Sequence, residues 1–166
     1  DNYYSHVGSF AAFTSGTAGA SIIRSNPELL ERFMPKVEVT GAAYSDMYMS
    51  RRISSLRAVD NRSTTYSAFI GGDNPLAVFH TSVGNGKSLV IVKESFGTAF
   101  ATWAMNHYET VYVIDPRRFN GFGGNYADFD LRTFYNLTHF DDLVIINYPG
   151  SISSSGIRQS ILNMVN

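Results

Sequence analysis

Cysteine is absent from the 166 residues of this chain. Its absence excludes disulfides, thiolate metal sites and a cysteine nucleophile together. Charged residues are also scarce, at 16% against about 25% in an average globular domain. Thirteen Lys and Arg residues against 14 Asp and Glu leave a net charge of −1. The basic excess that a nucleic-acid-binding surface needs is therefore missing, and we expect no nucleic-acid partner.

Long apolar runs are missing as well. None approaches the roughly 18 residues that span a bilayer, so we expect no membrane span. The first residues, Asp1-Asn2-Tyr3-Tyr4, are neither basic nor followed by an apolar core, so we expect no signal peptide within this chain. Hydrophobic residues make up 44% and aromatic residues 14%, which is the opposite of a disordered composition. The length suits one domain with one sizeable core, and we expect 1–166 to form a single domain.

The second half of the chain predicts an α/β fold. Continuous apolar runs are typical of strands buried on both faces, and they occur at 88–93, 110–114 and 143–146. Helical patterns follow these runs at 96–107, 128–137 and 155–165. Such alternation indicates a mostly parallel sheet over 88–165 with helices on both faces. A strand at 76–81 and the turn signal Asn85-Gly86 predict antiparallel strands or a hairpin before it.

The first half is harder to interpret. We predict an irregular lead-in over 1–70 and an αβ core over 71–166. Within the lead-in, 15–20 is typical of a loop, and Ser25-Asn26-Pro27-Glu28 is a helix-start signal. Val37 and Val39 alternate with polar residues and indicate a short strand.

Ligands of parallel α/β sheets bind outside the carboxyl ends of the strands. This rule points to three places: Lys93-Glu94-Ser95, Asp115-Pro116-Arg117 and 147–151. Ser95 lies where a strand turns into a helix, so the free N–H groups and the dipole of the first turn would favour an oxyanion beside its hydroxyl. We take Ser95 as the candidate nucleophile. The alternative is that Ser95 only caps the helix.

An acyl-transfer site also needs oxyanion donors and a base. The backbone N–H of Phe96 and the amide of Asn147 are the candidate donors, although Asn147 would equally suit a turn. Three of the four histidines are set aside: His107 lies at the far end of the predicted helix, His139 at the wrong end of the sheet, and His80 is typical of a partly exposed residue in an antiparallel strand. His6 lies in a segment whose position is not predicted, and it remains the candidate base.

Metal and phosphate sites find little support. No His, Asp and Glu cluster has ligand spacing, and the pairs Asp128/Asp130 and Asp141/Asp142 are typical of caps and surface carboxylates. The glycine-rich stretch 121–124 has neither a Walker pattern nor GxGxxG, and it is typical of a loop. We expect no metal and no cofactor.

Several motifs together resemble a known family. They are Gly71-Gly72-Asp73-Asn74-Pro75-Leu76, the stretch 85–100 around Lys93-Glu94-Ser95, His107-Tyr108, and the stretch 111–119 around Asp115-Pro116-Arg117. In order and spacing they resemble the DHHW family of bacterial exported proteins, which is related to SGNH-type hydrolases and alginate O-acetylation proteins. The resemblance extends over about residues 10–150 and is most specific over 69–119.

The resemblance implies a permuted, SGNH-like or flavodoxin-like three-layer fold in an extracytoplasmic protein of the bacterial cell envelope. It implies a serine in the Lys-Asp-Ser-like block, matched by Lys93-Glu94-Ser95 with Glu94 in place of Asp. The family's Asp-His-His-Trp motif, which supplies acid and base upstream, does not occur here, and the single Trp is Trp103. We therefore expect this chain to be the C-terminal part of a larger permuted domain. Whether the motif is truncated or truly absent stays open.

Two functions follow from these expectations. The first is a serine esterase or O-acetyltransferase acting on an acyl ester of carbohydrate, of which this chain alone would be nearly inactive. The second is a non-catalytic carbohydrate- or surface-binding module on the same fold. In that case some tyrosines, Tyr3, Tyr4, Tyr44, Tyr48, Tyr126 and Tyr148, would form sugar-stacking platforms instead of core.

Overall fold

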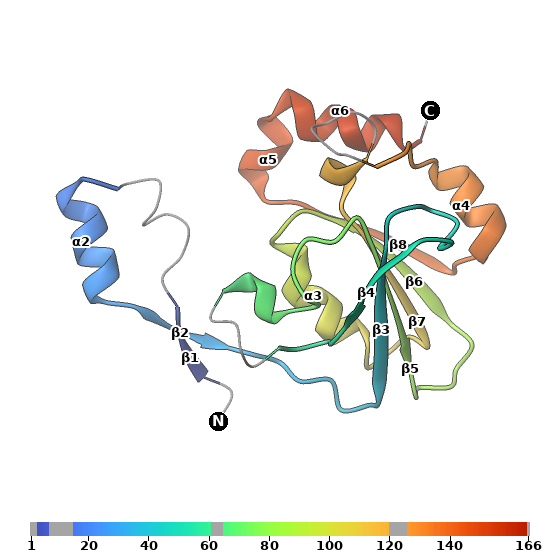
Figure 1. Cartoon of the computed structure of the whole chain (residues 1–166), viewed down its shortest axis with the longest axis horizontal. Coiled ribbons are helices and arrows are strands. Elements are labelled where there is room, and N and C mark those ends of the chain that lie inside the picture. The colour runs from blue at the N-terminus through green and yellow to red at the C-terminus, as the bar shows by residue number, and fades with distance from the viewer. Residues whose placement is uncertain (1–2, 7–14, 61–64, 120–125, 166) are drawn as a thin grey trace.

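The structure is a computed structural model and describes residues 3–6, 15–60, 65–119 and 126–165. Its centre is a six-stranded sheet in the order β4-β3-β5-β7-β6-β8 (Figure 1). These strands are β3 (Val39–Tyr44), β4 (Arg52–Leu56), β5 (Leu76–Thr81), β6 (Ser88–Lys93), β7 (Thr110–Ile114) and β8 (Asp142–Ile146). The helices around it are η1 (Tyr66–Ala68), α3 (Gly97–Ala104), η2 (Pro116–Arg118), α4 (Leu131–Thr138), α5 (Pro149–Ser153) and α6 (Ser155–Asn163).

The predicted α/β architecture is confirmed. Strand β6 pairs in parallel with β7 on one side and β8 on the other. Strand β5 is antiparallel to β7, and β3 is antiparallel to both β5 and β4. The parallel part therefore lies within 88–165 and antiparallel strands precede it, as the sequence predicts.

The sheet is covered on both faces, which gives three layers. Along β6, Leu89 and Ile91 face one core cluster, which contains Ala101 and Ala104 of α3. Val90 and Val92 face the other cluster, which contains Phe134 of α4 and, at its margin, Ile161 of α6. Because both faces are buried, β6 shows no alternation of apolar and polar residues. This is why the strand appears in the sequence as one unbroken apolar run.

The expected hairpin between 76–81 and 88–93 is wrong. Strand β7 lies between β5 and β6, so the two strands are not neighbours. The Asn-Gly turn crosses the bottom of the sheet and is tied to the segment after α3. The Asn85 amide donates to the His107 carbonyl (2.9 Å), and the Gly86 N–H donates to the Glu109 carboxylate (2.8 Å). A turn signal fixes local backbone direction, whereas pairing is decided by which strand buries more apolar surface.

The irregular lead-in over 1–70 is also corrected, because β3 and β4 belong to the main sheet. The helix of this region is α2 (Ala18–Ser25), not the stretch predicted to start at 25–28. Thr17 caps α2 by accepting the Ala20 N–H (3.3 Å). Pro27 follows the end of that helix, and β2 (Glu28–Glu31) comes next. A proline shortly after a helix is as common as one at its start, and the sequence alone does not separate the two.

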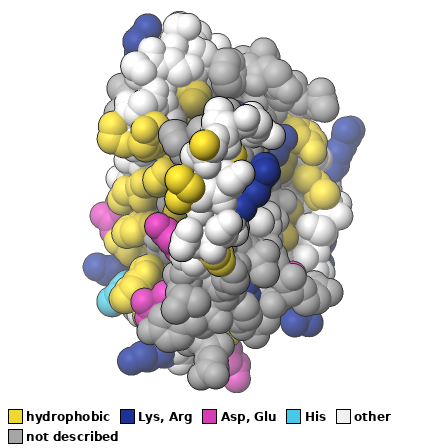
Figure 2. Space-filling model, turned by 90° about the vertical axis from the view of Figure 1, so that its left-hand side faces the viewer, with side chains coloured by type: hydrophobic (Ala, Val, Ile, Leu, Met, Phe, Trp, Pro, Cys, Tyr) yellow, Lys and Arg dark blue, Asp and Glu magenta, His cyan; other side chains and the backbone are white. Residues whose placement is uncertain are grey.

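The N-terminal elements lie to one side of the six-stranded sheet (Figure 1). Strand β1 (Tyr3–His6) pairs with β2 in a separate two-stranded sheet. Figure 2 views the molecule from this side, and hydrophobic side chains are visible at the surface among charged ones. Ile22 on α2 is one exposed hydrophobic residue of this region. Among the residues that the structure describes, no helix is both long enough and apolar enough to cross a membrane.

Candidate functional site

Four chain segments meet at one edge of the sheet, namely the edge formed by the carboxyl ends of the parallel strands β6, β7 and β8. Ser95 follows β6 by two residues, Asp115 directly follows β7, and Asn147 directly follows β8. Since β6, β7 and β8 are parallel, their carboxyl ends share this edge, as expected. Asp73 joins them from a different direction, because β5 runs antiparallel and therefore begins where its neighbours end. A backbone hydrogen bond from the Asp115 N–H to the Pro75 carbonyl (3.0 Å) holds the β5 entrance to this edge.

The Ser95 hydroxyl is held by charged side chains. Ser95 Oγ donates to Asp73 Oδ2 at 2.7 Å. Arg117 Nη2 donates to the same carboxylate oxygen at 2.7 Å and lies 3.4 Å from Ser95 Oγ. Ser95 itself is partly exposed. Its hydroxyl therefore has a fixed direction and still faces the solvent side of the sheet edge.

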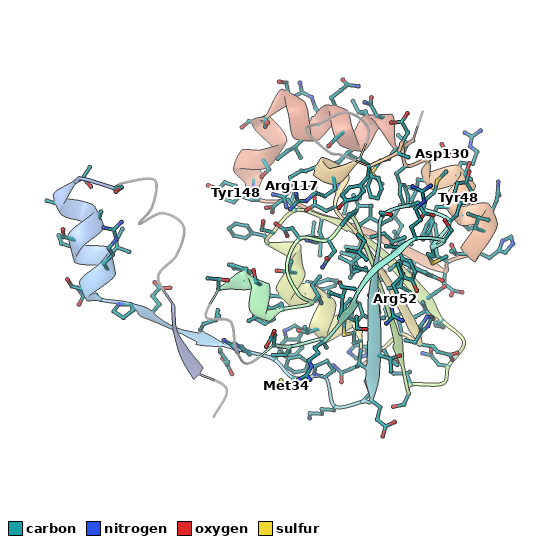
Figure 3. The ribbon with its side chains drawn as sticks, in the orientation of Figure 1. Met34, Tyr48, Arg52, Arg117, Asp130 and Tyr148 are labelled. Carbon is teal, nitrogen blue, oxygen red and sulfur yellow. The ribbon has the colours of Figure 1, made fainter. Side chains whose placement is uncertain are left out.

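A charged cluster lies beneath Ser95. Lys93 is completely buried, and its Nζ contacts Asp73 Oδ1 at 2.7 Å and Asp115 Oδ2 at 3.9 Å. Arg117 donates from Nε and Nη2 to the two oxygens of Asp115, at 2.8 and 2.5 Å. Figure 3 shows Arg117 just below α5, close to Tyr148. Two cations and two carboxylates thus balance, which is the condition under which buried charges are tolerated.

The cluster shifts the pKa values of Asp73 and Arg117. Burial alone would raise the pKa of Asp73, but the charge and hydrogen bond of Lys93, the Ser95 hydroxyl and the charge of Arg117 lower it to about 2, from 3.8. Hydrogen bonding to Asp115, partly offset by burial, raises the pKa of Arg117. Asp73 is therefore a carboxylate across the physiological range. A carboxylate with so low a pKa orients the Ser95 hydroxyl well but is a weak base.

We expect the Asp73→Asn variant to lose stability at neutral pH and to lose less at acid pH. A carboxylate with a lower pKa in the folded chain stabilises above its unfolded pKa, and this stabilisation disappears as the pH falls through the folded value of about 2. Partial exposure reduces the effect, so we expect a difference of about 1–2 kcal/mol at pH 7 that shrinks between about pH 5 and pH 2. Urea unfolding at both ends of this range measures it.

The control for this comparison is Asp128→Asn. Asp128 is exposed and makes no hydrogen bond with the residues that the structure describes. Its replacement should change the unfolding free energy at pH 7 by less than about 0.5 kcal/mol. A gap between wild type and Asp73→Asn that stayed constant from pH 7 to pH 2 would contradict the assigned ion pairs.

The candidate oxyanion donors come from the turn after β6 and from the end of β8. The N–H groups of Ser95 and Phe96 have no acceptor within the described part of the chain, whereas the next two, of Gly97 and Thr98, donate to the Glu94 and Ser95 carbonyls. Asn147 Oδ1 is buried and has no partner there. Oxygen and nitrogen of an Asn amide exchange by a simple rotation. The oxyanion roles of Phe96 and Asn147 stay predictions that this geometry permits.

Three of the four histidines lie away from Ser95. His80 lies near the far end of β5 and contacts the Thr110 hydroxyl (3.3 Å). His107 follows α3, and His139 ends α4 in the left-handed conformation with φ 49°. These placements confirm the reasons for setting the three aside. His6 lies in β1 opposite Glu28, in the two-stranded sheet, and its role as base stays a prediction.

The remaining predictions concern metal sites, two carboxylates and the glycine-rich stretch. No group of three or more metal-ligating side chains is found in the described ranges. Asp130 caps α4 by accepting the Thr133 N–H, and Asp141 accepts the Ser88 N–H at 2.7 Å, so both are structural as predicted. The glycine-rich stretch 121–124 lies outside the described residues.

The partners of Ser95 were not predicted from the sequence. Lys93 and Arg117 were placed at this edge without a role, and Asp73 was given none. One signal was available: Asp73 precedes a strand that the sequence predicts to be antiparallel, so its loop had to open onto the same edge as the ends of the parallel strands.

Comparisons with known proteins find one family model and several similar solved structures. The family model described as DHHW protein matches residues 36–114, a range that contains Asp73, Lys93 and Ser95. A DHHW family protein from Eubacterium siraeum has a similar crystal structure, with a TM-score of 0.76 and 21% identity over 99% of this chain and 54% of that chain. Comparison with functionally curated proteins finds no match.

The structure of Bacillus cereus PatB1 is also similar. With a sulfonyl adduct, PatB1 matches 80% of this chain and 46% of its own, with a TM-score of 0.59 and 13% identity. A second PatB1 structure covers the same share of this chain and 47% of its own, with a TM-score of 0.54. At these identities the likeness concerns the fold. The chain spans about half the length of the solved structures that it matches.

Proposed function

We propose that this chain is the serine-bearing part of an SGNH-like protein of the DHHW family that hydrolyses or transfers acyl esters, with Ser95 as the nucleophile. The observation that carries the proposal is the Ser95 hydroxyl, which Asp73 holds at 2.7 Å where β6 enters α3. The family match over 36–114 and the likeness to PatB1, which has been seen with a sulfonyl adduct, support it.

The chemistry is acyl transfer in two steps. Ser95 Oγ attacks the ester carbonyl, a C–O bond forms, and the hydroxyl proton passes to a base. The oxyanion would be stabilised by the N–H of Phe96, with the amide of Asn147 as second donor. The alcohol leaves with the proton, and water or an acceptor hydroxyl then attacks the acyl-serine and releases the free hydroxyl.

None of the described side chains that contact Ser95 is an effective base. Asp73 is too weakly basic because Lys93 and Arg117 neutralise it. A histidine with an ordinary pKa would suit the task. We propose two sources for this base. One is His6 of this chain. The other is a segment outside it, because the similar solved structures are about twice as long as this chain. We therefore expect this chain alone to turn over esters very slowly.

The cellular location and the substrate are also part of the proposal. The family resemblance favours an exported protein of the bacterial cell envelope, and an acyl ester of carbohydrate as substrate. Carbohydrate esterase and O-acetyltransferase differ only in whether water or a sugar hydroxyl takes the acyl group from Ser95. Both use the same nucleophile, so one labelling experiment tests both.

We expect an aryl sulfonyl fluoride to modify Ser95 when imidazole is added as an external base. The oxygen of Ser95 would bond to sulfur, fluoride would leave, and the proton would pass to imidazole. Mass spectrometry of peptides should show one adduct, on residue 95, and Ser95→Ala should abolish it. The rate should rise with imidazole concentration, because no described side chain in contact with Ser95 is an effective base.

Ser88→Ala is the matched control. Ser88 opens the same strand, and its hydroxyl also donates to a carboxylate, Asp141, at 3.1 Å. It lies at the opposite end of β6, away from the helix N-terminus, so this variant should be labelled like the wild type. Equal labelling of Ser88 and Ser95, or none at Ser95 at any imidazole concentration, would overturn the proposal.

A non-catalytic binding module is the second candidate. One observation favours it: in the described ranges Ser95 is bonded to charged side chains and to no histidine. On this alternative Asp73 and Ser95 only hold the loops of the sheet edge together. Ligand binding would then be unaffected by Ser95→Ala, and the sulfonyl reagent would not distinguish Ser95 from Ser88.

A further inference from the structure

Three exposed aromatic rings lie in a row beside Ser95, and we define Tyr66, Phe96 and Tyr148 as the aromatic ledge. Their exposed fractions are 36%, 54% and 49%. The centroids of Phe96 and Tyr148 are 5.2 Å apart with ring planes 22° from parallel, and those of Tyr66 and Phe96 are 6.0 Å apart at 33°. Single exposed apolar residues are ordinary, whereas contiguous exposed apolar patches are the kind of surface at which ligands and partners bind.

The ledge is held in place from several elements. Tyr66 belongs to η1 and also contacts Phe69, which is buried, with centroids 6.1 Å apart. Phe96 follows Ser95 directly at the start of α3, and Tyr148 precedes α5. Separate loops thus bring the rings together, and the row is anchored to the core at its Tyr66 end.

Tyr148 is held most firmly. Its N–H donates at 2.9 Å to the carboxylate of Glu94, which is buried. A Cβ on Gly150 would lie 2.4 Å from Cε1 of Tyr148, so the ring lies directly on the glycine backbone. Glu94 and Phe96 are the two chain neighbours of Ser95. The loop that carries Tyr148 is therefore tied to the Ser95 turn on one side and packs against it on the other.

We propose that the aromatic ledge is a stacking subsite for the sugar rings of a neutral oligosaccharide, whose acyl ester would reach Ser95. This deepens the proposed function and rests on it for the role of Ser95 only. Sugar rings have apolar faces edged with hydroxyls, which suits flat exposed rings with phenol groups at their edges.

Other ligands fit the ledge less well. An acyl chain binds best in an enclosed apolar pocket, whereas these rings lie open at the surface. A nucleic acid would need free cations beside the rings. The nearby Lys93 and Arg117 are both occupied by Asp73 and Asp115, and Lys93 has no exposed surface. A proline-rich peptide also stacks on aromatic rings, and the experiment must separate it from a sugar.

The test is calorimetric titration of the chain with neutral hexaoses (cellohexaose, chitohexaose and mannohexaose) and with a proline decapeptide. We expect at least one hexaose to bind. Phe96→Ala and Tyr148→Ala should each weaken that binding at least fivefold, while Tyr148→Phe, which keeps the ring, should weaken it less. Circular dichroism checks that each variant is folded.

Trp103→Ala is the matched control. Trp103 lies on α3, is exposed to the same 54% as Phe96, and stacks on Phe33 instead of the ledge. It should leave sugar binding unchanged. Binding of no hexaose, equal loss with Trp103→Ala, or tighter binding of the proline peptide would each overturn the ledge as a sugar subsite.

The same titration on Ser95→Ala separates the two proposals. If Ser95→Ala binds the hexaose but wild-type Ser95 is never sulfonylated, the ledge stands and the proposed catalysis fails. If Ser95 is sulfonylated but the ledge variants bind like wild type, the nucleophile stands and the ledge fails.

Discussion

Replacing Asp115 with alanine is expected to lower the free energy of unfolding by about 3–5 kcal/mol, the usual cost of breaking a buried ion pair from one side. Asp115 has no exposed surface, and its oxygens accept from the guanidinium and the N–H of Arg117. Its removal leaves Lys93, which is also fully buried, with Asp73 as its remaining carboxylate. Chemical unfolding of wild type and variant at pH 7 measures the difference.

Asp141→Ala provides the matched control for Asp115→Ala. Asp141 also accepts a backbone N–H beside a strand, from Ser88, but it is exposed. Its removal should therefore cost much less. A double-mutant cycle with Arg117→Ala should give a coupling of about 0.5–3 kcal/mol between residues 115 and 117. Additive effects of the two substitutions, or a loss no larger than that of Asp141→Ala, would contradict the cluster as described.

The charged cluster shows what the sequence could and could not predict. Two strands of the site were predictable: β6, which ends at Lys93, and β7, which ends directly before Asp115. Both are buried on both faces and so appear as continuous apolar runs. The rule that ligands bind at the carboxyl ends of parallel strands then predicted the edge that these strands share. The same rule placed Ser95 and Asn147 there. The pairings within the cluster did not follow. They depend on side chains that meet only once the sheet is assembled.

The order of the strands in the sheet could not be predicted from local sequence signals. The Asn85-Gly86 turn indicates a reversal of the chain, but β7 pairs with β5 on one side and β6 on the other, and its Val111 and Val113 are buried in the core cluster against α3. The same non-local choice brings Asp73 to Ser95. If β5 had paired with β6 as a hairpin, the loop before β5 would lie beside β6 itself, without β7 and Arg117 between them.

The predictions for the short elements before residue 32 were wrong for a different reason. Helix α2 has eight residues and β2 has four. Segments of this length carry too few apolar repeats to separate a period of 3.6 from a period of 2. The capping signals around Pro27 fit the end of one helix as well as the start of another. Their outcome was settled by pairing of β2 with β1, which no local pattern encodes.

Gly97→Ala is expected to destabilise the chain by about 1–3 kcal/mol and to disturb Ser95. A Cβ at this position would lie 2.4 Å from Cβ of Lys93 and 3.5 Å from Cβ of Ile146. The helix α3 can therefore start this close to the ends of β6 and β8 only with a glycine. In an open helix the same substitution would stabilise by up to about 1 kcal/mol, so the expected sign is reversed by the contact.

Moving α3 away from β6 would carry Ser95 with it, because the Thr98 N–H and hydroxyl both bind the Ser95 carbonyl, at 3.2 and 2.7 Å. We expect sulfonylation of Ser95 in the presence of imidazole to slow at least tenfold in Gly97→Ala. Gly19→Ala is the control, since the atom nearest to its added Cβ is the Thr17 hydroxyl oxygen at 3.6 Å, an ordinary contact with the N-cap residue of α2. That variant should lose neither stability nor labelling. If Gly97→Ala were as stable and as reactive as Gly19→Ala, close packing of α3 on β6 would not be what positions the serine.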